Sequence, residues 1–149
     1  MSSKADFSYE TTIAAPIGTV YEALTRPEGI TGWWTTAGEV STEVGGVHRL
    51  RWSEVDWTEI RVDWLAPPRS VDWTCTAAHM TDFSEPDEWV GTSISFELSE
   101  VEGGTRLSLV HHGLVPLSCI EMCERGWRFH LGESLKALVE SGRGAPIEV

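Results

Sequence analysis

The sequence predicts an α+β domain, with a curved antiparallel sheet of about six or seven strands wrapped on one long C-terminal helix. In residues 117–142 the apolar side chains recur at steps of three and four, which is typical of a helix with one buried face. Between residues 36 and 112 the apolar period changes to two, which is typical of half-buried strands joined by short turns. Two short helical patterns, at about 16–25 and from Pro27 onward, follow the first strand.

The long helical pattern runs from Leu117 to Gly142. Ser118 is a candidate N-cap, and Glu121 would complete a capping box. Gly142 fits a left-handed residue at the C-terminal end. The predicted buried face consists of Leu117, Ile120, Cys123, Trp127, Leu131, Leu135 and Leu138. Since no other element is long enough to cover a curved sheet, this helix is expected to close the domain.

The strand patterns begin at Phe7–Ile13 and continue through five further segments, 47–52, 57–65, 71–75, 90–98 and 106–112. Alternation places one apolar set on a common face. That inward set is His48, Leu50, Trp52, Ile60, Val62, Trp64, Val71, Trp73, Cys75, Thr92, Ile94, Phe96, Leu98, Leu107, Leu109 and His111. The acidic segment 79–88 reads as a loop, and the groups Asp56/Glu59 and Glu85/Asp87/Glu88 are expected in solvent.

Length and composition indicate a single domain over residues 1–149, with its core at about 6–142 and a short, loose tail after Gly142. The formal net charge is −12 and the only lysines are Lys4 and Lys136, so nucleic-acid binding is excluded. There is no apolar run long enough for a membrane span and no signal segment, which predicts a cytoplasmic protein. Three cysteines do not make a disulfide framework.

Several short motifs occur in an order and at a spacing that resemble a known family. They are Ile13-Ala14-Ala15-Pro16, Val20-Tyr21-Glu22-Ala23-Leu24-Thr25, Pro27-Glu28-Gly29, Gly32-Trp33-Trp34, Val44-Gly45-Gly46, Leu50-Arg51-Trp52, the strand 92–98, Gly103-Gly104-Thr105-Arg106-Leu107, and Gly126-Trp127 with Leu135. Over residues 6–142 the chain resembles the START-like (SRPBCC, helix-grip) superfamily. Within it, the chain is similar to bacterial homologues of the heat-shock-protein-90 ATPase activator, and the similarity covers the C-terminal domain of that activator.

The resemblance implies a seven-stranded sheet around the C-terminal helix, with a cavity between them. It also implies a functional range that includes lipid-transfer, polyketide cyclase and hydrophobic-ligand proteins. The eukaryotic co-chaperone has an additional N-terminal domain that binds the chaperone, for which we expect no room in 149 residues.

Large aromatic residues on the inward face predict a pocket for a small hydrophobic ligand with a planar ring or an acyl portion. The expected opening lies near Trp33, Trp34 and the 79–88 loop. The alternative is a packed aromatic core without a cavity. The predicted ligand-binding residues are Trp33, Trp34, Trp52, Trp64, Trp73, Phe96, His111, Cys123, Trp127 and Leu131.

His111 is a weak candidate for a general acid or base, while the favoured interpretation is a hydrogen-bonded residue of the pocket wall. Cys119 and Cys123 share a helical face, which raises the hypothesis of a zinc site with His111 or His112. His130 is too far along the helix to join both cysteines. Buried thiols packing as small apolar groups are favoured, so no metal and no cofactor are predicted.

Three functions follow from these observations. The first is binding of a hydrophobic small molecule. The second is a chaperone-accessory or stress-response module that binds a partner protein, as the resemblance implies. The third is a cyclase- or hydrolase-like enzyme using His111 with cavity water. The absence of a nucleophile elbow, a phosphate loop and an H-E-x-x-H motif favours a protein that is not an enzyme.

Overall fold

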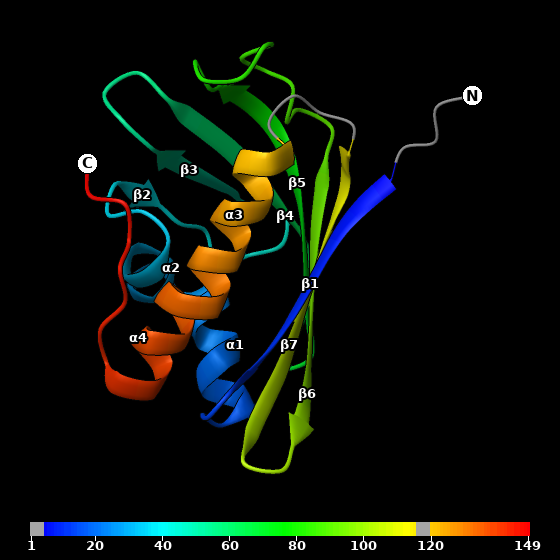
Figure 1. Ribbon diagram of the computed structural model, residues 1–149, viewed down its shortest axis with the longest axis vertical. Helices are drawn as coiled ribbons and strands as arrows, with labels where there is room; N and C mark the ends of the chain where they lie inside the picture. The colour runs from blue at the N-terminus through cyan, green and yellow to red at the C-terminus, as the bar shows by residue number, and fades with distance from the viewer. Residues whose placement is uncertain (1–4, 116–119) are drawn as a thin grey trace.

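The computed structural model describes residues 5–115 and 120–149. The described chain forms one seven-stranded antiparallel sheet in the order β1-β7-β6-β5-β4-β3-β2 (Figure 1). The strands are β1 Ala5–Ile13, β2 Gly38–Glu39, β3 Val47–Arg51, β4 Trp57–Ala66, β5 Ser70–His79, β6 Ser93–Val101 and β7 Gly104–Val115. The helices α1, Ile17–Thr25, and α2, Pro27–Trp33, lie between β1 and β2. The predicted fold class is confirmed.

The C-terminal helix runs without interruption from Ile120 to Ser141 and lies across one face of the sheet (Figure 1). It consists of α3, Ile120–Phe129, the π-helical segment η1, His130–Leu135, and α4, Lys136–Ser141. Gly142 has φ 89°, which confirms the predicted left-handed end. The predicted start of the helix, with Ser118 as its cap, lies outside the described residues.

Glycine determines how closely this helix approaches β1. A Cβ atom added at Gly132, inside the π-helical segment, would collide with the hydroxyl oxygen of Tyr9. A larger residue would therefore displace either the tyrosine or the helix. The π-helical segment therefore approaches Tyr9 of the edge strand closely at Gly132.

The predicted inward face of the strands is confirmed except at Trp64, which is 54% exposed and lies on the outer face. The register of β4 against β5 shifts between Val62 and Trp64: Val62 lies opposite Trp73, but Trp64 lies opposite Asp72. The extra residue, Asp63, forms a bulge that reverses the alternation after it. The indole of Trp64 instead donates a hydrogen bond to the Ser70 hydroxyl (3.1 Å). The prediction that Trp64 faces the interior is wrong.

The chain after Gly142 packs against the domain, which corrects the expectation of a loose tail. Ile147 pairs with Thr35 in a parallel bridge, and its backbone N–H donates to the Trp34 carbonyl (3.0 Å). The Ala145 N–H donates to the Ser134 hydroxyl on the helix (2.7 Å). The chain after Gly142 is therefore attached to the domain, although none of its side chains is fully buried.

The two short helices contribute buried side chains to the apolar interior and are held close to each other. The indole N–H of Trp33 donates to the Ala23 carbonyl (2.8 Å), which ties the end of α2 to α1. The two helices meet at Gly29, where an added Cβ would lie 2.5 Å from the Ala23 carbonyl oxygen. Among the described helices, none is long and apolar enough to cross a membrane.

Candidate ligand-binding site

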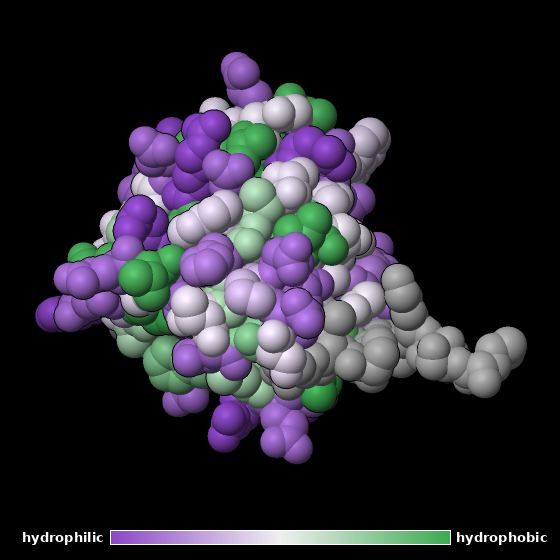
Figure 2. Space-filling model, turned by 90° about the horizontal axis from the view of Figure 1, so that it is seen from above, coloured by the Kyte–Doolittle hydropathy of each residue, from purple (hydrophilic) through white to green (hydrophobic). Residues whose placement is uncertain are grey.

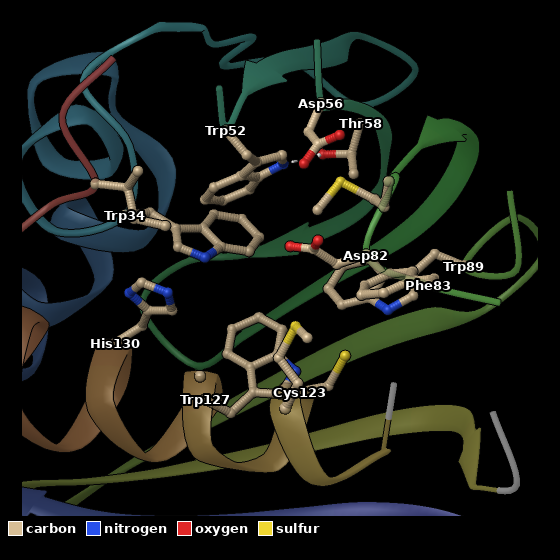
Figure 3. Close-up of a pocket in the computed structure, with 14 residues that line it drawn as sticks. Trp34, Trp52, Asp56, Thr58, Asp82, Phe83, Trp89, Cys123, Trp127 and His130 are labelled. Atoms are coloured by element: carbon tan, nitrogen blue, oxygen red, sulfur yellow. Dashed lines mark hydrogen bonds between the residues drawn. The ribbon is translucent and has the colours of Figure 1, made fainter. Parts of the chain in front are cut away.

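A pocket of about 270 Å³ lies between the helix and the β2–β5 half of the sheet (Figure 3). Its walls come from four places: the end of α2, the β3–β4 region, the β5–β6 connection, and the first turns of the long helix, with the C-terminal tail closing one side. The lining residues are Trp34, Trp52, Asp56, Thr58, Met80, Asp82, Phe83, Trp89, Met122, Cys123, Gly126, Trp127, His130 and Ile147.

The aromatic walls are held in place by contacts with one another and by hydrogen bonds. Trp34 packs edge-on against Trp52 at 5.1 Å between ring centroids, and tilted against Trp127 at 5.3 Å. The Trp52 indole N–H donates to the Thr58 hydroxyl (3.1 Å). Gly126 leaves open space on the helix side, because a Cβ there would meet only His130 within 4 Å, at 3.9 Å.

His111 is the central member of a chain of hydrogen bonds that begins at Trp127 in the pocket wall. The Trp127 indole N–H donates to His111 Nδ1 (3.0 Å), so the ring proton lies on Nε2. Nε2 therefore donates to the Thr92 hydroxyl (2.9 Å), which in turn donates to the Trp89 carbonyl (2.7 Å). Burial lowers the pKa of His111 to about 3, which keeps the ring neutral. With both nitrogens in use and no exposed surface, His111 acts as a link between β7 and α3.

The neighbouring histidines have different environments. His112 faces outward, with Nδ1 3.0 Å from an Asp6 carboxylate oxygen, as the predicted inward–outward alternation requires. His48 is buried, its Nδ1 accepts from the Ser41 N–H (3.1 Å), and burial lowers its pKa to about 4.

His130 lies in the wall of the pocket at the start of the π-helical segment (Figure 3). Burial lowers its pKa to about 4, so the ring is neutral at pH 7. Its buried Nδ1 atom has no hydrogen-bond partner among the described residues.

The predicted site residues divide into three groups. Trp34, Trp52, Cys123 and Trp127 line the pocket. Trp33, Trp73, Phe96, His111 and Leu131 are buried in the core and do not line it. Trp64 lies on the opposite face of the sheet. Whether the lining residues bind a ligand stays a prediction at this point, and Cys119 of the zinc hypothesis lies outside the described residues.

The sequence predicts that the 79–88 loop lies near the opening, but the predicted site residues include none of the lining residues of this connection. Met80, Asp82, Phe83 and Trp89 come from the β5–β6 segment, which carries no periodic pattern. Asp56 was expected in solvent, yet it is only 9% exposed, because its Oδ1 accepts from the backbone N–H (3.0 Å) and hydroxyl (2.9 Å) of Thr81. The apolar residues Phe83 and Trp89 inside an acidic segment were the available signal that this segment covers a pocket.

The fold and the site define a helix-grip domain of the START-like class, a sheet wrapped on a long helix with a cavity between them. Residues 14–140 match the family described as Activator of Hsp90 ATPase homolog 1-like protein, and the chain belongs to that family.

Solved structures agree with this assignment. The chain is similar to a protein described as the Aha1 dimer from Colwellia psychrerythraea, with 27% identity over 94% of this chain and 99% of that one, and a TM-score of 0.80. A protein from Mesorhizobium loti shares the fold at 21% identity, covering 91% of this chain and 97% of that one, with a TM-score of 0.78. A protein from Staphylococcus saprophyticus also shares the fold at 22% identity, covering 95% of this chain and 96% of that one, with a TM-score of 0.73. Among curated proteins, none matches this chain.

Proposed function

We propose that this protein binds a small hydrophobic ligand, with an aromatic ring or a short acyl segment, in the pocket between sheet and helix. The observation that carries the proposal is the aromatic lining of a cavity of about 270 Å³. An engineered cavity of about 150 Å³ holds one benzene molecule, so this pocket has room for roughly ten to twelve non-hydrogen atoms. Binding would be driven chiefly by burial of the apolar surface of the ligand.

Gly126 provides a test that leaves the walls intact. In a Gly126→Phe variant, the new side chain should extend from the helix into the pocket and abolish ligand binding. The matched control is Gly126→Ala, whose Cβ meets only His130 at an ordinary van der Waals distance. Because alanine is the better helix former, the control should keep binding and gain about 0.5–1 kcal/mol of stability.

Binding is measured by NMR of the indole N–H signals with a panel of aromatic and short acyl compounds. The expected result is that Trp34, Trp52 and Trp127 shift, that the exposed Trp64 does not, and that Gly126→Phe shows no shifts. Unchanged pocket signals across the whole panel would contradict the proposal. Native mass spectrometry of freshly purified protein provides an independent search for a co-purified molecule.

A chaperone-accessory role is the second candidate, supported by the family to which the chain belongs. It predicts that the protein stimulates the ATPase of a heat-shock-protein-90 chaperone and is retained by the immobilised chaperone. An ATPase rate that does not change at saturating protein would count against it. The cytoplasmic location and the stress-response role stay predictions.

A further inference from the structure

Two carboxylates line the aromatic pocket, and they belong to different parts of the fold. Asp56 lies in the connection between β3 and β4, and Asp82 lies in the connection between β5 and β6. Figure 3 shows the Asp82 carboxylate pointing into the pocket, toward Trp34. Asp56 holds the β5–β6 connection through Thr81, but no hydrogen bond or ion pair within the described residues accounts for Asp82 in these walls.

Asp56 is nine-tenths buried and only half satisfied. Both of its hydrogen bonds come from Thr81, a neutral residue, and both end on Oδ1. Within residues 5–115 and 120–149, neither Asp56 nor Asp82 forms an ion pair, and the lining includes no lysine or arginine. Asp82 is exposed, but Asp56 is buried, and burying a carboxylate without a cation costs free energy, which a positively charged ligand would offset.

The rest of the pocket suits such a ligand. Indole and phenyl rings attract cations through the negative charge on their faces, and Trp34, Trp52, Trp89, Trp127 and Phe83 all contribute to the walls. His130 is neutral and has a buried Nδ1 without a partner among the described residues, so that atom can accept a hydrogen bond from an ammonium N–H.

The surroundings of the pocket add to the negative field. Glu85, Asp87 and Glu88 belong to the same β5–β6 connection as Asp82, and the chain as a whole has a net charge of −12. Seen from above, the surface shows hydrophilic residues interspersed with separate apolar ones and no single broad apolar area (Figure 2). A concave site of one charge sign with low-dielectric walls concentrates ligands of the opposite charge.

We infer that the pocket binds an organic ammonium cation, with the charged group between Asp56, Asp82 and His130 and the apolar part against the tryptophans. The inference rests on the proposed ligand-binding function and narrows it to one class of ligand. It concerns a small amine of about ten non-hydrogen atoms, the size that the cavity volume allows.

Three probes with the same phenylpropyl frame separate charge from burial: 3-phenylpropylammonium, 3-phenylpropan-1-ol and 3-phenylpropanoate. Their binding to the full chain is measured by calorimetry and by quenching of tryptophan fluorescence. The cation should bind most tightly and the anion most weakly, and the affinity of the cation should be about tenfold higher than that of the alcohol.

Asp82→Asn should reduce this preference to about twofold or less and leave the affinity for the alcohol nearly unchanged. Asp87→Asn is the matched control, because Asp87 is exposed like Asp82 and lies on the same connection, but does not line the pocket. It should keep the preference for the cation.

Equal affinity for cation and alcohol would overturn the inference and leave the proposed function standing. So would a preference for the cation that survives Asp82→Asn. If none of the three probes binds, the inference fails, and the Gly126 experiment decides the proposed function separately.

Discussion

Two neighbouring regions of the interior use the same residue types in different ways. Around Trp33, Trp73, Phe96 and His111 the aromatic rings are fully buried, and every nitrogen of His111 has a partner. Around the pocket, by contrast, the buried Nδ1 of His130 has no partner among the described residues, and both hydrogen bonds to the Asp56 carboxylate end on the same oxygen. The comparison teaches that aromatic content does not distinguish a core from a site. An unpaired polar atom marks a site only where it lies beside empty space, because Tyr21 Oη and His48 Nε2 are also buried without a partner among the described residues but do not line the pocket.

Trp127 belongs to both regions, since it lines the pocket and donates to His111. Trp127→Ala should have the largest effect on stability, a loss of about 3–5 kcal/mol in the free energy of unfolding. The indole is only 2% exposed and its removal also leaves a buried histidine nitrogen without a donor. Urea unfolding followed by circular dichroism measures the loss. A value below about 1 kcal/mol would mean that the helix is held to the sheet by other contacts.

Acid should destabilise the protein through its buried histidines. In the folded state the pKa values of His48 and His130 are about 4 and that of His111 about 3, all below the ordinary value of 6.5. Their contribution is fully present above pH 6.5. As the pH falls from 6.5 toward the folded pKa values, the unfolded chain takes up protons that the folded chain does not, and stability decreases.

The slope for each of these histidines approaches about 1.4 kcal/mol per pH unit between pH 6 and 5, where the unfolded ring is mostly protonated, and urea unfolding at a series of pH values measures it. His48→Asn should lower the total slope by the contribution of one histidine. Stability that does not change between pH 6 and 5 would contradict the burial of these rings.

Substitutions of Trp64 and Trp73 compare the two faces of the sheet. The change at Trp64 should have the smallest effect on the free energy of unfolding. Trp64→Thr keeps a strand-forming residue on the outer face, so the loss should stay within about 0.5 kcal/mol. The matched variant Trp73→Thr removes a buried ring from the adjacent strand and should lose several times more. Equal losses in urea unfolding would show that the bulge at Asp63 does not turn Trp64 outward.

The sequence by itself determined the element order, the long covering helix, its end at Gly142 and nearly all of the inward face. These depend on periods of 2 and 3.6 residues, and such local patterns can be read without knowing what each element packs against. The family resemblance came from the same local motifs.

Only the tertiary structure decided which tryptophans line the pocket and which are buried in the core. A bulge of one residue reversed Trp64, and non-local contacts brought Ile147 back to Trp34 and buried Asp56 against Thr81. No periodic pattern encodes such contacts, because they join segments far apart in the chain, and the β5–β6 connection has no period to read. The chemistry of the pocket therefore lies mainly in its connections, where local sequence rules are weakest.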